Sequence, residues 1–267
     1  MPVTGSQAYE GSPSFTPTYT APTDGSTVSG TVTCTTVNGG TPITPTLTTG
    51  GTYTIDDSSC TGLRESDSAD YAFSYTGGTF TVSIATPTVH VTETPSPAKL
   101  GVVTYHVTVS GAGATPTGSV SDGTRSCSIA SLNGSGAGSC AFGEPAGTHS
   151  VKATYSSNAN YVAASATLSV SVAKATPAVH LAASSSPAVR GFVTHTATFT
   201  GVPRFASTGT VTISDGTRTC TATVNAVSDI GSCRINEPTG TFTISALYNG
   251  NSNYTTKLVT IRGVVNS

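Results

Sequence analysis

A stretch of about 90 residues occurs twice in this chain of 267 residues, and this internal repeat constrains the fold more than any other feature. The sequence ATPTVH at residues 85–90 returns as ATPAVH at residues 175–180. Farther along, SDGTR at residues 121–125 returns unchanged at residues 214–218, so the second copy has gained three residues between the two matches. One fold must therefore suit both copies.

Each copy shows the alternation of apolar and polar residues that is typical of half-buried β-strands. The predicted inward positions of one strand are Val193, His195, Ala197 and Phe199 in the second copy and Val103, Tyr105, Val107 and Val109 in the first. Thr fills the opposite phase in the second copy, where a β-branched side chain suits a solvated strand face. The first copy reads GSVSDG where the second reads GTVTISDG, which predicts a shorter strand there.

An Asp-Gly pair at residues 122–123, repeated at 215–216, predicts a hairpin with a type I′ turn, because both central residues of that turn need a positive φ. About seven short strands per copy, with frequent turn signals and no capped helical pattern, are typical of a β-sandwich. The sequence therefore predicts an all-β fold.

The composition excludes several classes of protein. Only 9% of the residues are charged and the net charge is −2, which provides no basic surface for nucleic acid or for an acidic membrane. Thr (51) and Ser (36) make up about a third of the chain. No apolar run approaches the ~18 residues of a membrane span, and Leu, Glu and Lys are too scarce for a coiled coil.

The six cysteines predict three disulfides and an oxidising compartment. Two pairs have the same spacing of 13 residues, Cys127 with Cys140 and Cys220 with Cys233, which leaves Cys34 to Cys60. The alternative is six buried thiols in a cytosolic protein. No CxxC occurs, so zinc-ribbon and thioredoxin-like sites have no ligand spacing. Each spaced pair is expected to span one short hairpin rather than to join two sheets.

The two copies resemble the bacterial Ig-like repeats that occur in tandem in large surface and secreted proteins. The residues that carry the resemblance are the opening Thr-Pro-x-Val, Ser-Pro-Ala before the second strand, Ser-Asp-Gly-Thr, the two cysteines and the closing Ala-x-Tyr and Asn-Tyr. The resemblance covers residues 86–175, called here the first repeat, and residues 176–267, called the second repeat. It implies an Ig-like sandwich for each and no particular function.

Residues 1–85, called here the N-terminal segment, are not a third copy. Tyr71, Phe73 and Tyr75 alternate before Gly77-Gly78, and Phe80 and Val82 alternate after it, which predicts a hairpin with a Gly-Gly turn. The order of its motifs resembles the MBG domains, small β modules that alternate with Ig-like repeats in bacterial surface proteins. The family opener usually reads Tyr-Gly, whereas here Glu10 stands between Tyr9 and Gly11.

The sequence thus predicts three tandem β domains, at residues 1–85, 86–175 and 176–267, of which the last two are Ig-like sandwiches. The linkers around residues 85–87 and 173–177 are short and contain proline, which favours an extended chain. We expect an elongated rod, with strands of ~3.3 Å per residue giving roughly 100 Å for three domains. The N-terminus lacks the basic and apolar regions of a signal peptide, so we expect a piece of a longer protein.

An acidic stretch offers the one metal-site hypothesis. Glu65, Asp67 and Asp70, near Asp56-Asp57, could supply oxygen ligands to Ca²⁺. The spacing lacks the EF-hand pattern, so a solvated loop is the favoured interpretation.

Other candidate chemistry is weaker. The histidines lack a neighbouring nucleophile and carboxylate. Glu144 and Glu237 occupy the same position in different domains, too far apart for a glycosidase pair. The lysines do not recur between copies, which disfavours an internal isopeptide bond. Arg125 and Arg218 are expected to be exposed turn residues. We therefore expect no enzyme activity, no resident metal and no cofactor.

Two functions remain open. The first is a non-catalytic stalk or spacer in a larger bacterial cell-surface or secreted protein. The alternative is an adhesin-type module that recognises a glycan or a host protein through loops at the sandwich ends. Both predict an extracellular or cell-surface location, neighbouring domains of a longer chain as partners, a monomer, and neither nucleic-acid binding nor membrane insertion.

Overall fold

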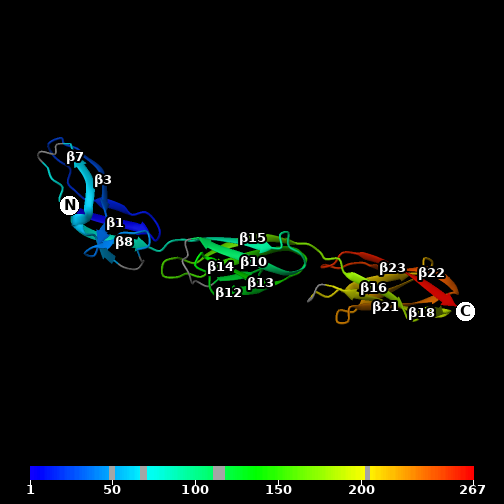
Figure 1. The fold of residues 1–267 in the computed structure, drawn as a ribbon. Helices are drawn as coiled ribbons and strands as arrows, with labels where there is room; N and C mark the ends of the chain where they lie inside the picture. The colour runs from blue at the N-terminus through cyan, green and yellow to red at the C-terminus, as the bar shows by residue number, and fades with distance from the viewer. Residues whose placement is uncertain (48–51, 67–70, 111–117, 202–204) are drawn as a thin grey trace.

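The computed structural model describes residues 1–47, 52–66, 71–110, 118–201 and 205–267. The chain is all-β and elongated, with its two ends in the outermost parts of the molecule (Figure 1). Within the described ranges the one helical element is a 3₁₀ turn, η1 (Asp57–Ser59). The predicted fold class and elongated arrangement are confirmed, whereas the domain boundaries after residues 85 and 175 stay a prediction.

The N-terminal segment packs a four-stranded sheet against two smaller pairs of strands. Its strands are β1 (Pro2–Ala8), β2 (Ser14–Pro17), β3 (Val28–Cys34), β4 (Thr36–Val37), β5 (Thr41–Pro42), β6 (Thr52–Thr54), β7 (Cys60–Glu65) and β8 (Thr76–Ser83). The sheet has the order β2-β1-β8-β6, with β1 and β8 parallel, while β3 pairs with β7 and β4 with β5. Val3, Val32, Ile55 and Phe80 are among the buried residues of its core.

The predicted Gly-Gly hairpin is wrong, because Gly77 and Gly78 lie inside β8. A Cβ atom added to Gly77 would collide with the carbonyl oxygen of Ile55, and one added to Gly78 with the carbonyl oxygen of Val3. The two glycines therefore allow neighbouring backbones to approach closely, which is a second reason for glycine in a strand besides a turn.

The two repeats share the same strand order, apart from one short edge strand (Ala188–Val189) that only the second repeat has among the described residues. The strands of the first repeat are β9 (Thr88–Thr94), β10 (Gly101–Ser110), β11 (Gly118–Ser121), β12 (Ser126–Ile129), β13 (Ala137–Glu144), β14 (Gly147–Tyr155) and β15 (Ala164–Val172). Those of the second are β16 (Ala178–Ala183), β17 (Ala188–Val189), β18 (Gly191–Thr200), β19 (Gly209–Ser214), β20 (Thr219–Val224), β21 (Ile230–Glu237), β22 (Gly240–Tyr248) and β23 (Lys257–Asn266). The sheets are β13-β10-β9 and β12-β11-β14-β15 in the first, and β16-β18-β21 and β17-β23-β22-β19-β20 in the second.

The strand periodicity predicted the buried faces correctly. All eight predicted inward residues of β10 and β18 are buried in the core between the two sheets of their repeat. The shorter strand of the first repeat is also confirmed, since β11 has 4 residues and its counterpart β19 has 6. Apolar burial of this kind provides most of the stability of a sandwich.

The Asp-Gly hairpins form, but their turns are not type I′. Gly123 has a φ of 88° and Gly216 one of 94°, whereas neither aspartate has a positive φ. Instead, Asp122 Oδ1 accepts hydrogen bonds from the backbone N–H groups of Thr124 and Arg125. An aspartate side chain that satisfies the turn backbone in this way stabilises a longer loop than a two-residue turn.

The three predicted cysteine pairs form disulfides, but two of these bonds join two sheets, whereas the prediction placed each within a hairpin. Cys127 lies in β12, at the edge of the four-stranded sheet, and Cys140 lies in β13, at the edge of the three-stranded sheet. Cys220 in β20 and Cys233 in β21 repeat this arrangement. Each bond therefore joins the two sheets at one edge of the sandwich, because β13 and β21 pair with β10 and β18 instead of folding back onto the preceding strand.

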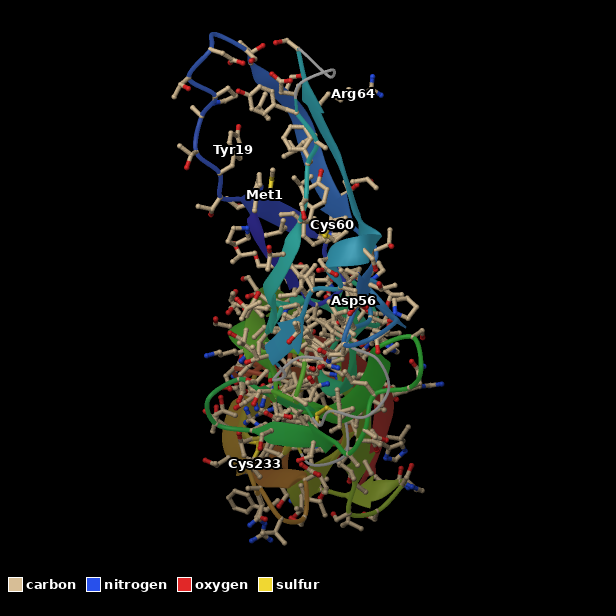
Figure 2. The ribbon with its side chains drawn as sticks, turned by 90° about the vertical axis from the view of Figure 1, so that its left-hand side faces the viewer. Met1, Tyr19, Asp56, Cys60, Arg64 and Cys233 are labelled. Atoms are coloured by element: carbon tan, nitrogen blue, oxygen red, sulfur yellow. A yellow bond between two sulfur atoms is a disulfide. The ribbon has the colours of Figure 1, made fainter. Side chains whose placement is uncertain are left out.

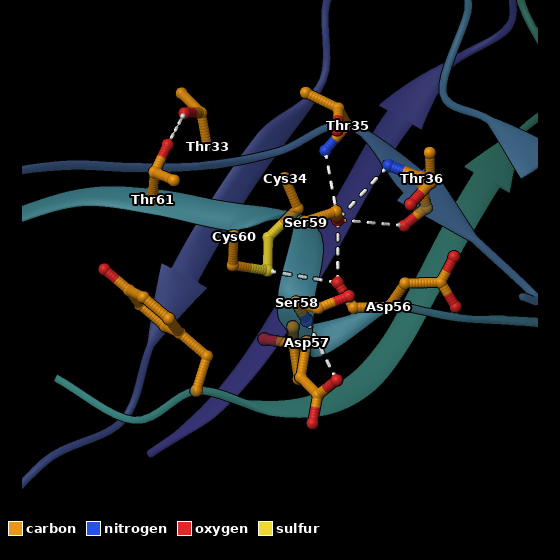
Figure 3. The surroundings of a disulfide bond; sticks show 12 residues. Thr33, Cys34, Thr35, Thr36, Asp56, Asp57, Ser58, Ser59, Cys60 and Thr61 are labelled. Carbon is orange, nitrogen blue, oxygen red and sulfur yellow. Dashed lines mark hydrogen bonds between the residues drawn. A yellow bond between two sulfur atoms is a disulfide. The ribbon is translucent and has the colours of Figure 1, made fainter. Parts of the chain in front are cut away.

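The disulfide of the N-terminal segment lies within one pair of strands. Cys34 of β3 and Cys60 of β7 face each other directly, with 4.1 Å between their Cα atoms. Figure 3 shows Ser59 beside this bond, where its Oγ accepts hydrogen bonds from the N–H groups of Thr35 and Thr36 and donates one to the carbonyl oxygen of Asp56 at 2.7 Å. The disulfide thus joins β7 to β3, and the hydrogen bonds of Ser59 hold the turn before β7 against the backbone that follows β3.

Candidate functional site

The residues of the predicted Ca²⁺ site are not all described. Glu65 ends β7 and is half-buried, while Asp67 and Asp70 lie outside the described residues. Nearby, the carboxylate of Asp56 accepts hydrogen bonds from the N–H groups of Gly39 at 2.7 Å and Gly40 at 2.8 Å. The bond from Gly39 is the main cause of the lowered pKa of Asp56. Asp56 therefore holds a backbone turn, and the Ca²⁺ site stays a prediction.

The structure places the two glutamates that end β13 and β21 in the same kind of buried site. Glu144 and Glu237 are 0% and 2% exposed. Tyr105 Oη donates a hydrogen bond of 2.7 Å to Glu144 Oε1, and in the second repeat His195 Nε2 lies 2.7 Å from Glu237 Oε1. A carboxyl group withdrawn from water needs such a partner, because burial without one is costly.

The first repeat adds further polar groups around its glutamate. His149 Nδ1 lies 3.7 Å from Glu144 Oε2, and Arg125 Nη1 lies 4.0 Å from the same oxygen. Arg125 also pairs with Asp122 at 3.2 Å, so this arginine is an ion-pair partner and not a free turn residue. In the second repeat Phe242 replaces His149, and Arg218 pairs only with Asp215, at 3.1 Å, among the described residues.

Burial and hydrogen bonds move the pKa values of this group in opposite directions. Burial raises the pKa of Glu144, and it raises the pKa of Tyr105 strongly, so the phenol keeps its proton and donates it. Burial acts on Asp122 in the same sense, but the N–H groups of Arg125 and Thr124 and the guanidinium of Arg125 outweigh it, so the pKa of Asp122 is lowered. The cluster therefore combines an aspartate whose charged form is favoured by its donors with a buried glutamate whose charged form is disfavoured by burial.

The second candidate feature is the joint between consecutive parts of the chain. Ser83, the last residue of β8, accepts a hydrogen bond from Tyr9 N–H. Ala85 is already bonded to the next part, since its N–H donates to Asn160 O at 2.9 Å and its carbonyl accepts from Val162 N–H at 3.0 Å. Ile84 is therefore the one residue between these two sets of backbone hydrogen bonds.

The joint between the two repeats is built in the same way. Ala173 N–H donates to Ala98 O in the first repeat, and Ala175 exchanges hydrogen bonds with Asn253 O and Thr255 N–H in the second. Lys174 stands between them, and its Nζ donates to Asn251 O at 2.7 Å. A linker with one intervening residue has little conformational freedom to bend.

Side chains reinforce both joints. The rings of Tyr9 and Tyr161 meet edge to face with their centroids 5.3 Å apart, which joins the N-terminal segment to the first repeat. Between the repeats, Asn253 Oδ1 accepts the N–H of Ala146 at 3.0 Å, and Leu100 of the first repeat is buried in the core of the second. Contacts of this kind resist rotation about a linker that the backbone alone would permit.

Sequence reasoning identified part of these features. It found the repeated Asn-Tyr pair but left open where Tyr161 and Tyr254 point, and both are buried in their cores. The Asn two residues before that pair would have been a signal, since Asn158 and Asn251 each accept two backbone N–H groups of the loop. The burial of Glu144 had no local signal, because its partner Tyr105 lies 39 residues earlier.

Comparison with known families matches residues 91–173 to the bacterial Ig-like domain (group 3), and no curated protein matches the chain. Among solved structures, three titin domains (I67–I69) have 11% identity and a TM-score of 0.36 over 99% of this chain and 96% of theirs. The fibronectin(III)-like modules of Clostridium thermocellum CbhA have 15% identity and a TM-score of 0.28, over 66% of this chain and 94% of theirs. The mouse nectin-like molecule 4 ectodomain has 17% identity and a TM-score of 0.27, over 81% and 74%.

None of the helical residues in the described part of the chain forms a segment able to cross a bilayer. The family match covers the first repeat, and the second repeat shares its sequence pattern and its strand order. Domains of this fold are typically non-catalytic and occur in bacterial surface proteins. The chain therefore carries tandem Ig-like β-sandwich domains.

Proposed function

We propose that the chain is a non-catalytic structural spacer within a larger bacterial cell-surface or secreted protein. The observation that carries this proposal is the construction of the joints. At each joint a single residue, Ile84 or Lys174, separates the backbone hydrogen bonds of one part from those of the next. A spacer needs this property, since short stiff joints convert a row of domains into a fixed distance.

The two joints also present the same exposure pattern, which supports a repeated device rather than two unrelated contacts. Residues 82–90 and residues 172–180 have identical sequences of buried, half-buried and exposed positions, with Pro87 and Pro177 buried in both. Proline fixes φ and favours an extended residue before it, which removes freedom from the unfolded linker as well. A chain with more repeats would extend by the same step at every joint.

The disulfides support the cellular location that this proposal assigns to the chain. Three disulfides and no free cysteine fit an extracellular or cell-surface location, since such bonds persist in oxidising compartments. In this proposal the partners are the neighbouring domains of the parent chain, the N-terminal segment is an MBG-type module, and the chain is a monomer. The outward-facing Thr and the low charge of the repeats support a weakly interacting surface.

Nuclear magnetic relaxation of the intact chain tests the stiffness on which the proposal depends. Rigid joints make both repeats tumble as one elongated body, so backbone ¹⁵N relaxation of β14 and β22 fits a single anisotropic diffusion tensor. The proposal is contradicted if each repeat tumbles with the short correlation time of an isolated domain of about 90 residues. A matched control is insertion of a flexible Gly-Ser segment after Lys174, which should separate the two motions.

One observation favours the adhesin-type alternative. The N-terminal segment has a cavity of about 320 Å³ whose lining includes Met1, Tyr19, Tyr71 and Phe73. Tyr19 and Tyr71 are 44% and 43% exposed, and Figure 2 shows Tyr19 and Met1 together beside the open loop of this end. Aromatic rings in such positions can stack on sugars.

Screening against glycans and matrix proteins separates the two functions. The spacer gives no saturable binding. An adhesin-type module binds a defined glycan, and substitution of Tyr19→Ala removes that binding. Tyr53→Ala, in β6 and outside the lining of the cavity, leaves it unchanged. Binding that meets both conditions would replace the spacer by the alternative.

A further inference from the structure

We propose that Asp122, Glu144 and His149 of the first repeat form a binding site for a divalent transition-metal ion, with Zn²⁺ as the representative ion. The candidate ligand atoms of the three side chains all lie within 4.8 Å of one another. Zn²⁺ binds carboxylate oxygen and imidazole nitrogen at about 2.0–2.2 Å, which places neighbouring tetrahedral ligands roughly 3.3–3.6 Å apart. Small rotations of these side chains therefore suffice to close the site.

His149 is already oriented as a metal ligand. Its Nε2 lies 2.9 Å from the carbonyl oxygen of Pro145, and because a carbonyl only accepts, Nε2 carries the proton. In the tautomer with the proton on Nε2 alone, the lone pair of Nδ1 faces Glu144 Oε2 at 3.7 Å. Metal-binding histidines usually donate their second ring N–H to a carbonyl or a carboxylate, which fixes the ring in this way.

Glu144 provides a second, independent observation that points to a ligand. Its Oε1 accepts the hydrogen bond of Tyr105, whereas its Oε2 is buried and accepts no hydrogen bond from any residue that the structure describes. The side chain is 0% exposed, so bulk water does not satisfy that oxygen. A buried carboxylate oxygen without a donor is unfavourable, and a cation bound between it and His149 removes the deficit.

The donor set indicates the class of ion. Two carboxylates and one imidazole suit zinc and the neighbouring divalent metals, whereas Ca²⁺ takes six to eight oxygen ligands and disfavours nitrogen. The side chains of His149 and Asp122 are 17% and 3% exposed, so an ion can enter from the surface beside His149 and keep one water molecule. A position left for water is typical of sites with three protein ligands.

Arg125 opposes the ion in the present arrangement. Its guanidinium occupies the space beside Asp122 Oδ2 at 3.2 Å and lies 4.0 Å from Glu144 Oε2. The arginine side chain is 37% exposed, so it can rotate into solvent when the ion binds. The loss of its ion pair reduces the affinity, and the substitution Arg125→Ala should therefore tighten binding instead of weakening it.

The second repeat supplies a natural control. It contains the counterparts Asp215 and Glu237, but Phe242 stands where the first repeat has His149. In addition, His195 Nε2 lies within hydrogen-bond distance of Glu237 Oε1. The phenylalanine shows that this fold accepts an aromatic hydrocarbon at the position. The substitution His149→Phe therefore removes the metal ligand without requiring the sandwich to change its packing.

The experiment is a Zn²⁺ titration of the chelator-treated full chain by calorimetry, with native mass spectrometry to count the ions. We expect one ion per chain. His149→Phe should lower the affinity for Zn²⁺ at least ~100-fold. Changing only a group that hydrogen-bonds to a metal ligand already lowers metal affinity about 10–100-fold, and this substitution removes a ligand itself. Arg125→Ala should raise the affinity, and His106→Ala, which changes an exposed histidine of β10, should leave it unchanged.

Hydrogen exchange locates the ion and keeps the result independent of folding. Saturation with Zn²⁺ should slow exchange in β13 and β14 of the first repeat, with no change in β21 and β22 of the second. The proposal fails if the wild-type chain binds no Zn²⁺ at millimolar concentration, if His149→Phe binds as tightly as wild type, or if protection appears in the second repeat. None of these outcomes depends on whether the chain is a spacer.

Discussion

The disulfides that join the two sheets offer the sharpest quantitative prediction. Cys127–Cys140 and Cys220–Cys233 each have a sequence separation of 13, and each links edge strands that do not pair with one another. Closing a loop of this length removes unfolded-state entropy worth about 3 kcal/mol. The double substitution of Cys127 and Cys140 by Ala should therefore destabilise the first repeat by about 3 kcal/mol, with the second repeat unchanged.

Hydrogen exchange read by mass spectrometry suits this test, because the chain has no tryptophan and peptides resolve one repeat from the other. The slowest amides of β14 report global opening of the first repeat, and those of β22 report the second. A loss of about 3 kcal/mol accelerates exchange in β14 by roughly 150-fold. The substitution of Cys220 and Cys233 should give the mirror-image result.

Two results would refute this reasoning. An acceleration of less than about fivefold in β14 would show that the bond adds little beyond the sheets themselves, as happens when the unfolded state retains structure. Equal acceleration in both repeats would show that they unfold as a single unit. The disulfide of the N-terminal segment has a separation of 26, so its removal should cost about 0.6 kcal/mol more.

Three further predictions follow from individual contacts. Tyr9→Ala removes the edge-to-face contact across the first joint, worth about 0.5–1.5 kcal/mol, and should loosen that joint in ¹⁵N relaxation while both repeats stay folded. Asp215→Ala removes the acceptor of two turn N–H groups and should lower the thermal midpoint of the second repeat by the equivalent of about 1–3 kcal/mol at neutral pH. Because the pKa of Asp215 is lowered in the fold, its contribution is present above the unfolded pKa of about 3.9 and disappears as the pH falls through the folded value, so the variant and wild type should converge in acid when midpoints are measured against pH. Gly78→Ala places a Cβ against a backbone carbonyl and should destabilise the N-terminal segment by roughly 1–3 kcal/mol in denaturant unfolding, whereas Gly134→Ala, which meets nothing within 4 Å, should have little effect.

The sequence predicted what depends on local periodicity and repetition. Alternation along β10 and β18 identified which residues face the core, because a strand places every second side chain on one face. Repetition of the cysteine spacing identified the correct disulfide partners. Neither feature says which strands become neighbours, so β13 was expected to fold back onto β12 and instead pairs with β10.

The errors share this physical origin. Gly77 and Gly78 carry a turn signal, and only the packing of β8 against distant backbone at Val3 and Ile55 explains why they lie in a strand. The burial of Glu144 had no signal in the sequence, because it depends on a tyrosine from another strand. Contacts between residues far apart in the sequence decide these positions, and the local sequence pattern does not indicate such contacts.

Small-angle X-ray scattering of the intact, oxidised chain tests the central claim most directly, since the claim is that the joints hold the domains in an extended row. A rod of roughly 100 Å, as the strand lengths imply, has a radius of gyration of about 29 Å. A chain of 267 residues folded as one compact body would have about 18 Å. We predict a value near the first, with one well-defined maximum dimension. A value near the second, or a broad distribution of dimensions from freely bending joints, would contradict the account.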